Sequence, residues 1–267
     1  MRRSAFLLAG VLIAAINLVP VFLILKQAFT PESESFAWPP TWWPREWTLE
    51  NFRSLQSAID LQAGLMRSVL VALLAAASSL ALALPAAWRA ARDARVDRIL
   101  DGTMIVTRLF PSLALAVPLA SLFVQVGLYN NPAALGLWLA HTVLGVPFAF
   151  FILRNGLRAV PPDIEEAALL DGATAAQMFR RILLPVVRPS LAAATILVFL
   201  VSWDEFAYAL LLQVTNRPLP PLVYYLSAFG YPGMASAVAA LMIIPALCII
   251  VILEPALRSG ALSGSGR

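Results

Sequence analysis

Residues 165–185, "EEAALLDGATAAQMFRRILLP", form a charged, helix-forming segment between two long apolar runs. The segment stands out because 60% of the 267 residues are hydrophobic and only 13% are charged. The mean hydropathy is +0.81, which a soluble domain of this length does not reach. The chain is therefore predicted to be a polytopic membrane protein that keeps this segment out of the lipid.

The segment is predicted to form two short helices joined by a glycine. Asp163 and Glu166 follow a pair of prolines and have the spacing of an N-terminal capping box. Gly172 suits the left-handed residue that closes a helix, because it has no Cβ atom. Thr174 and Gln177 repeat the capping-box spacing and predict a second helix, which ends at the proline closing the quoted stretch. The apolar side chains of this helix recur every four residues, so one face is expected to pack against the membrane helices while its two arginines face water.

Outside this segment, six apolar windows are long enough to cross a membrane. A hydrocarbon core of about 30 Å takes about 20 helical residues. Each window is expected to be an α-helix, because backbone groups in lipid must be satisfied within the segment. The predicted fold is an all-α membrane protein, a single transmembrane domain over residues 1–267, with a loop at 154–188. The windows are 6–25, 68–88, 104–126, 133–153, 190–213 and 236–253.

The basic residues predict the direction of these spans, since short cytoplasmic loops carry an excess of Arg and Lys. With the N-terminus inside, thirteen basic residues fall on the cytoplasmic side and five outside, so both termini and the 154–188 loop are expected in the cytoplasm. They form no clustered face with interleaved aromatic residues, which argues against nucleic-acid binding. The inner residues are Arg2, Arg3, Arg89, Arg92, Arg95, Arg98, Arg154, Arg158, Arg180, Arg181, Arg188, Arg258 and Arg267. The outer residues are Lys26, Arg45, Arg53, Arg67 and Arg217.

Two expected outer loops are rich in aromatic residues. The loop at 30–67 has Trp38, Trp42, Trp43 and Trp47, which favour an interfacial belt over a partner-binding role. The loop at 214–235 has four further aromatic residues, which are either belt residues or stacking surfaces for a sugar. These are Tyr224, Tyr225, Phe229 and Tyr231.

Polar groups inside membrane windows mark either a transport pathway or a helix contact. Asp204 and Glu205 lie deep in the fifth window, with Trp203 before them and Tyr208 one turn later, and either reading fits these four residues. Arg108, near the inner end of the third window, is expected to reach the interface or to pair with the nearby Asp101. 

Three further single residues carry weaker predictions. His141 and Asn17 are expected to form interhelical hydrogen bonds, and Cys248, within a run of Ile and Leu, is expected to be a small buried apolar residue. One histidine and one cysteine in different spans make no metal site.

The segment at residues 165–185, which we call the elbow, resembles a known family signature. Glu166-Ala167-Ala168, Gly172, Ile182 and Leu184-Pro185 match the EAA motif of the membrane subunits of binding-protein-dependent ABC importers, between spans four and five as in that family. Residues 47–52, 110–119 and 203–206 are similar to the sugar-importing branch, specifically its maltose-type second permease subunit. Two positions depart from it: Asp204 stands where the branch often has Asn, and Arg67-Ser68 where Asn-Ser is common.

This resemblance implies a type I ABC importer permease fold in which the elbow is a coupling helix docking on a separate ATPase. The implied partners are a second, homologous permease in a heterodimer, two ATPases that bind ATP and Mg, an outer solute-binding protein, a mono-, di- or oligosaccharide, and lipid of the bacterial inner membrane. The 203–208 residues named above would line the substrate pathway, and the aromatic residues of the 214–235 loop would contact the binding protein. The implied coupling residues are Glu165, Glu166, Ala167, Ala168, Asp171 and Gly172.

The energy source is expected to lie on another chain. A phosphate-binding loop needs a lysine, and the only lysine is Lys26 at the end of the first span, so this chain is not an enzyme by itself and binds no cofactor. Two alternatives stay open: an ABC permease for a non-sugar solute, such as glycerophosphodiesters or amino acids, and an ion-coupled secondary transporter that uses Asp204 and Glu205. The second alternative offers no reason for a capped elbow in water.

Overall fold

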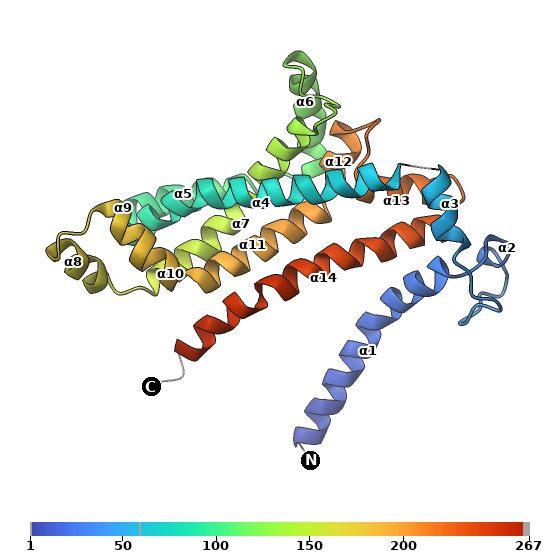
Figure 1. Cartoon of the computed structure of the whole chain (residues 1–267), viewed down its shortest axis with the longest axis horizontal. Helices are drawn as coiled ribbons and strands as arrows, with labels where there is room; N and C mark the ends of the chain where they lie inside the picture. The colour runs from blue at the N-terminus through green and yellow to red at the C-terminus, as the bar shows by residue number, and fades with distance from the viewer. Residues whose placement is uncertain (1, 59, 264–267) are drawn as a thin grey trace. The chain divides into compact units, whose positions relative to one another are not determined.

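The computed structural model describes residues 2–58 and 60–263, and every regular element in these ranges is helical (Figure 1). The chain forms two compact units: residues up to Leu65 with Arg217–Pro245, and Met66–Asn216 with the chain from Ala246 onward. The helices are α1 (Arg2–Ala28), α2 (Glu32–Ser35), α3 (Glu50–Ala58), α4 (Leu61–Arg92), α5 (Ala94–Val106), α6 (Ser112–Gln125), α7 (Leu135–Arg158), α8 (Pro162–Leu170), α9 (Ala175–Met178), a π-helical turn η1 (Phe179–Leu183), α10 (Leu184–Val186), α11 (Arg188–Trp203), α12 (Ala207–Leu212), α13 (Leu219–Ala228) and α14 (Pro232–Ser263).

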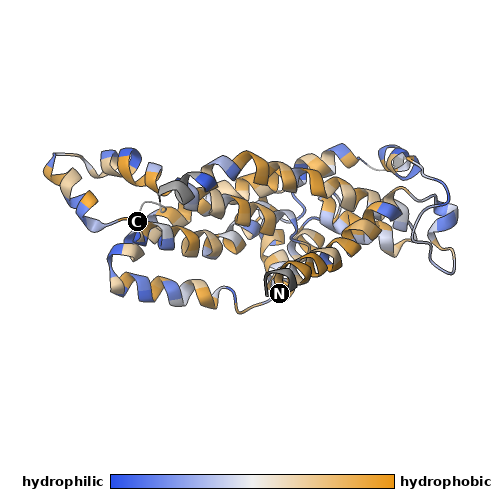
Figure 2. Ribbon diagram, turned by 90° about the horizontal axis from the view of Figure 1, so that it is seen from below, coloured by the Kyte–Doolittle hydropathy of each residue, from blue (hydrophilic) through white to orange (hydrophobic). Residues whose placement is uncertain are grey.

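Four of the six predicted spans are single helices. Within the described residues, α1, α4, α7 and α14 are long and apolar enough to cross a membrane, and a bent pair made of Ala175–Val186 and Arg188–Trp203 would be a fifth. Figure 2 shows hydrophobic residues along these long helices and hydrophilic residues mostly toward loops and helix ends. The predicted windows at 6–25, 68–88, 133–153 and 236–253 are therefore confirmed as helices.

The continuous helices predicted for 104–126 and 190–213 are wrong. The first window is interrupted between α5 and α6, where Pro111 is extended (φ −64°, ψ 140°) and cannot donate a backbone hydrogen bond. The second is interrupted after Trp203, because the Glu205 carboxylate accepts hydrogen bonds from the backbone N–H groups of Ala207, Tyr208 and Ala209 and so caps a new helix.

The second unit is organised around α7, which packs closely on α4 and α11. A Cβ atom on Gly145 would lie 2.5 Å from Ser79 Oγ and from Val198 Cγ1. A Cβ atom on Gly156 would lie 2.0 Å from Ser190 Oγ. Small residues at these crossings let the backbones approach, as is usual in membrane bundles.

In the first unit, a buried asparagine joins the end of α1 to α3. Asn51 Nδ2 donates to the backbone oxygens of Ala28 at 3.0 Å and Thr30 at 2.8 Å, which satisfies two carbonyls at or just beyond the helix end. A Cβ atom on Gly233, in the first turn of α14, would lie 2.4 Å from Asn51 Oδ1. Asn51 therefore helps to close the loop between α1 and α3, together with the hydrogen bond from the Thr48 backbone N–H to Phe29 O at 3.0 Å.

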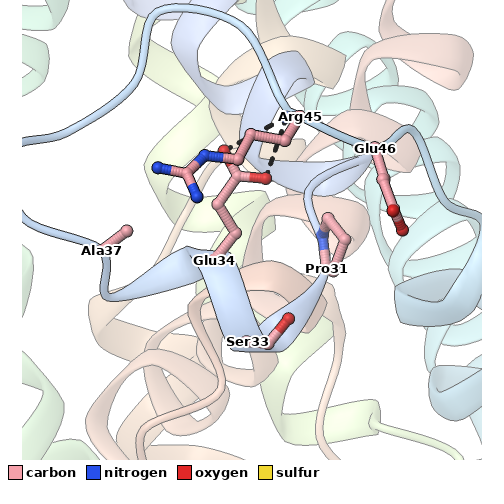
Figure 3. A pocket seen from close by; sticks show the side chains of 6 residues that line it. All are labelled: Pro31, Ser33, Glu34, Ala37, Arg45 and Glu46. Atoms are coloured by element: carbon pink, nitrogen blue, oxygen red, sulfur yellow. Dashed lines mark hydrogen bonds between the residues drawn. The ribbon is translucent and has the colours of Figure 1, made fainter.

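The loop after α1 is folded back on itself by Glu34 (Figure 3). Its carboxylate accepts hydrogen bonds from Thr41 Oγ1 at 2.8 Å and from the Arg45 backbone N–H at 3.0 Å. The four tryptophans of this loop are exposed, and Trp38 reaches 87%. Their exposure fits the interfacial belt that the sequence predicts.

The single-residue predictions have mixed outcomes. The interhelical hydrogen bond predicted for His141 is confirmed, because its Nδ1 lies 2.7 Å from Ser202 Oγ on another helix. The same prediction for Asn17 is wrong, because its side chain donates a hydrogen bond to Ile13 O of its own helix. It lies in a stretch of α1 of which no part is buried. Cys248 is exposed rather than buried, because α14 turns that face outward.

Arg108 does not pair with Asp101. Its guanidinium carbon lies 3.7 Å from the ring centroid of Phe148 on α7, while Asp101 accepts a hydrogen bond from Arg154. The pairing prediction fails because α7 supplies partners to both residues.

Candidate functional site

The elbow at 165–185 folds as two helices around a glycine. Gly172 has a φ of +80°, the left-handed conformation expected at the end of α8, and a Cβ atom there would meet nothing within 4 Å. Thr174 and Gln177 form the predicted capping box, with each side chain accepting a hydrogen bond from the other residue's backbone N–H. The glycine is therefore required by backbone conformation and not by lack of space.

Two details of the elbow differ from the prediction. Asp163 does not cap α8; the helix begins at Pro162, as proline at a first helical position allows, and Asp163 lies in its first turn. The second helix does not end at Pro185; it continues as α10 and joins α11 through a bend of 73°. Its inward face is confirmed, since Met178 and Leu183 are buried while its two arginines are exposed.

Most of α8 is open to solvent. Figure 1 shows α8 beyond the ends of α4, α7 and α11 in its unit. Among the predicted coupling residues, Glu166, Ala167, Asp171 and Gly172 are exposed, and only Ala168 is buried. Leu170, beside them, is 88% exposed. The helix thus presents an acidic and apolar surface that no described residue covers.

Glu165 is different, because its side chain turns inward and is only 13% exposed. It accepts a hydrogen bond from Arg92 Nε at 2.8 Å and from Trp88 Nε1 at 3.4 Å. Arg92 and Trp88 belong to the last turns of α4 and carry no motif, so the sequence did not single them out for this site. Among the charged coupling residues, Glu165 therefore contacts the helix bundle, whereas Glu166 and Asp171 face the solvent.

A second ionic group ties α5 to α7 nearby. Arg154 Nη1 donates to Asp97 Oδ1 at 2.9 Å and to Asp101 Oδ1 at 2.5 Å, and Arg158 Nη2 lies 2.5 Å from Asp97 Oδ2. These contacts stabilise the end of α7 that leads into α8.

The predicted pathway residues lie at the break between α11 and α12. Trp203, Glu205 and Tyr208 are buried, and only Asp204 is exposed. Glu205 Oε2 lies 3.6 Å from His141 Nε2 on α7, while Trp203 stacks on Phe199 with ring centroids 5.7 Å apart. Three of the four residues are therefore held in helix contacts within the described chain.

The aromatic residues of the 214–235 loop surround a cavity of about 500 Å³ in the first unit. Tyr225, Phe229 and Tyr231 line it, and Tyr224 does not. The guanidinium carbon of Arg217 lies 4.4 Å from the Tyr225 ring centroid, close enough for a cation–π contact. The remaining lining residues are Ser54, Ser57, Leu222, Leu226 and Met234.

Residues 79–259 match the family of binding-protein-dependent transport system inner membrane components, and the chain belongs to this family. It is a non-catalytic permease subunit of a binding-protein-dependent ABC importer of the inner membrane. The complex contains ATPase and binding-protein components, and ATP is bound by the ATPase subunits. Membership of this family argues against the ion-coupled alternative, because the complex contains ATPase subunits that bind ATP.

Individual relatives cover nearly the whole chain. It is 31% identical over 264 residues to the sulfoquinovosyl glycerol transport system permease protein SmoH of Agrobacterium fabrum, covering 97% of this chain and 92% of that one. It is 28% identical over 271 residues to the trehalose transport system permease protein SugB of Mycobacterium tuberculosis, covering 99% and 97%. A bacterial ABC transporter that imports the polysaccharide alginate has the same fold, with a TM-score of 0.71 at 18% identity over 95% of this chain and 96% of that one.

Proposed function

We propose that this chain forms half of the pathway of a sugar importer and is driven through α8. The observation that carries the proposal is the exposed α8–Gly172–α9 elbow, a capped acidic and apolar surface at one end of its unit. In this proposal Glu166, Ala167, Asp171 and Leu170 face a groove on an ATPase subunit that holds ATP and Mg. The second half of the pathway is a homologous permease in a heterodimer.

In the same proposal the chain crosses the membrane six times and forms one transmembrane domain. The α5–α6 and α11–α12 segments cross as interrupted spans, which membrane bundles tolerate where neighbouring helices or side chains satisfy the freed backbone groups. The cap that Glu205 places on α12 supports this for the second segment. The excess of basic residues in the same segments supports a cytoplasmic location of both termini and the elbow.

Two observations support a sugar as the cargo. The chain is similar to permeases whose names state trehalose and sulfoquinovosyl glycerol transport. Its 500 Å³ cavity combines aromatic rings, an arginine and two serine hydroxyls, the mixture of stacking surface and hydrogen-bonding groups expected of carbohydrate contacts. We place the contact with the sugar-loaded binding protein at this cavity, and Asp204 on the translocation pathway.

The proposal is tested by purifying the complete complex and identifying the solute bound to its binding protein by mass spectrometry. Proteoliposomes containing the complex should accumulate that solute only when ATP is supplied on the α8 side. A sugar is the expected solute. Recovery of an amino acid or a phosphodiester as the transported solute would overturn the sugar assignment, and uptake that persists with an ATPase unable to hydrolyse ATP would overturn the coupling.

A further inference from the structure

Arg92, in the last turn of α4, holds two other helix ends at once. Its Nη1 donates to Leu157 O at 3.1 Å and its Nη2 to Val160 O at 3.2 Å, so the guanidinium sits at the negative end of the α7 dipole. Its Nε donates to Glu165 Oε1 at 2.8 Å, and Nη2 bonds the same oxygen. Glu165 in turn lies in the first turn of α8, where a helix favours negative charge.

Trp88, one turn earlier in α4, extends this arrangement. Its Nε1 donates to Glu165 Oε2 at 3.4 Å, and its ring centroid lies 5.8 Å from that of Phe179, the first residue of η1. We call Trp88, Arg92 and Glu165 the Arg92 cluster. Through it the end of α4 contacts α7, α8 and η1 at the same point.

The Arg92 cluster is more shielded from solvent than an ordinary surface ion pair. The Arg92 and Glu165 side chains are 19% and 13% exposed, so their attraction is screened less than that of exposed charges. The planar guanidinium of Arg92 donates to several acceptors in a rigid geometry, so it also fixes the orientation of Glu165 relative to α4. An ammonium group would not do this. By comparison, the Arg89–Asp93 pair on the same helix end has its arginine 68% exposed.

The covalent route from the C-terminal end of α8 to the next long helix, α11, is less direct. It passes through the left-handed Gly172, the short α9, the π-helical η1 and α10, and then turns by 73° into α11. Each of these is a point at which rotation of α8 can be absorbed before it reaches α11. The Arg92 cluster bypasses all of them, because it joins α8 directly to α4 and adds side-chain contacts across the short link, residues 159–161, through which α7 leads into α8.

We propose that Arg92 is a positioning residue that transmits the displacement of α8 to α4 and α7 by holding Glu165. This inference rests on the proposed function, in which α8 docks on an ATPase subunit. In this proposal the outward surface of α8 contacts the ATPase subunit, and its inward carboxylate, Glu165, contacts the helix bundle.

The test uses the complete complex in proteoliposomes and measures solute uptake per ATP hydrolysed. Arg92→Met keeps an unbranched apolar stem but removes the charge and the hydrogen-bond donors. We expect the complex to assemble and hydrolyse ATP while uptake per ATP falls about tenfold, within the usual range of coupling between linked sites. Glu165→Gln should lower the same ratio less, because one hydrogen-bonding oxygen is retained. Arg89→Met is the matched control, with the same substitution one turn away, and should leave the ratio unchanged.

A re-linking experiment separates transmission from simple stability. In a Cys248→Ser background, which removes the exposed native thiol, the Arg92→Cys and Glu165→Cys pair should be uncoupled until a short bifunctional thiol reagent joins the two positions and restores uptake per ATP. Normal coupling in both Arg92→Met and Glu165→Gln would overturn the proposal. So would coupling that re-linking fails to restore. If Arg92→Met does not assemble, Glu165→Gln decides alone.

Failure of the proposed function has a different signature. A Glu166→Cys probe in the same Cys248→Ser background should crosslink to the ATPase subunit. Absence of this crosslink in a complex that imports its solute would overturn docking through α8. A crosslink together with normal coupling in the Arg92 variants would overturn only the Arg92 cluster as the transmission point.

Discussion

At the residue scale, Gly172 sets the angle of the elbow by its backbone alone. Its φ of +80° costs an L-residue about 1–2 kcal/mol, and proline cannot adopt it. Because Gly172 is exposed, Gly172→Pro should leave membrane insertion intact and uncouple ATP hydrolysis from uptake, whereas Gly172→Asn should be tolerated. The measurement is uptake per ATP in the reconstituted complex. Normal uptake by Gly172→Pro would contradict this role.

Glu34 provides a pH-dependent contact on the same scale. Its pKa lies below the ordinary value, first because of the hydrogen bond from the Arg45 backbone and then because of that from Thr41. A depressed folded-state pKa contributes stability above the unfolded-state pKa, and that contribution is lost as pH falls through the folded value. Acidification from about pH 7 to about pH 3 should therefore loosen the loop, seen in tryptophan fluorescence.

The change in fluorescence with pH should largely disappear in Glu34→Gln, which cannot titrate. Glu46→Gln alters the charge of the same loop equally and should keep the wild-type response. An unchanged acid response in Glu34→Gln would show that another group orders the loop.

At the scale of elements, the crossing of α7 and α11 depends on Gly156. Gly156→Ala would place a Cβ atom 2.6 Å from Ser190 Cβ, and such overpacking costs about 1–3 kcal/mol. The thermal transition of the detergent-solubilised protein should fall, and Ser190→Gly added to the same chain should recover it. Gly102→Ala, where a Cβ atom would meet nothing within 4 Å, is the control and should not destabilise. A stable Gly156→Ala single variant would contradict the packing at this crossing.

At the scale of the whole molecule, substitutions of the neighbouring residues Asp204 and Glu205 should have different effects, one on transport and the other on assembly. Asp204 is exposed at the break between α11 and α12, so Asp204→Ala should lower uptake severalfold and leave the complex assembled. Glu205 is buried and caps α12, so Glu205→Ala should lower the yield of folded complex, since a lost cap costs about 1 kcal/mol. Size-exclusion chromatography and uptake are measured on both variants. Loss of assembly in Asp204→Ala would show a structural role instead.

Much of this molecule follows from local pattern. The long apolar helices, the left-handed Gly172 and the Thr174–Gln177 capping box depend on residues adjacent in sequence, and all are found in the structure. The interruptions of the third and fifth windows were missed because apolar composition alone does not reveal a break, although Pro111 and Glu205 were visible signals. Asn17 and Cys248 were misjudged because apolar composition does not say which side of a helix faces a neighbour.

The order of residues was enough to establish a membrane protein with a capped elbow between its apolar helices, because hydropathy, capping spacing and glycine conformation act over a few residues. Which elbow residues face outward and which face the bundle was decided only in the folded chain. Arg92 and Glu165 are 73 residues apart, and no local rule joins them. They meet because the packing of α4 beside α7 brings the C-terminal end of α4, which carries Arg92, against the start of α8, which carries Glu165.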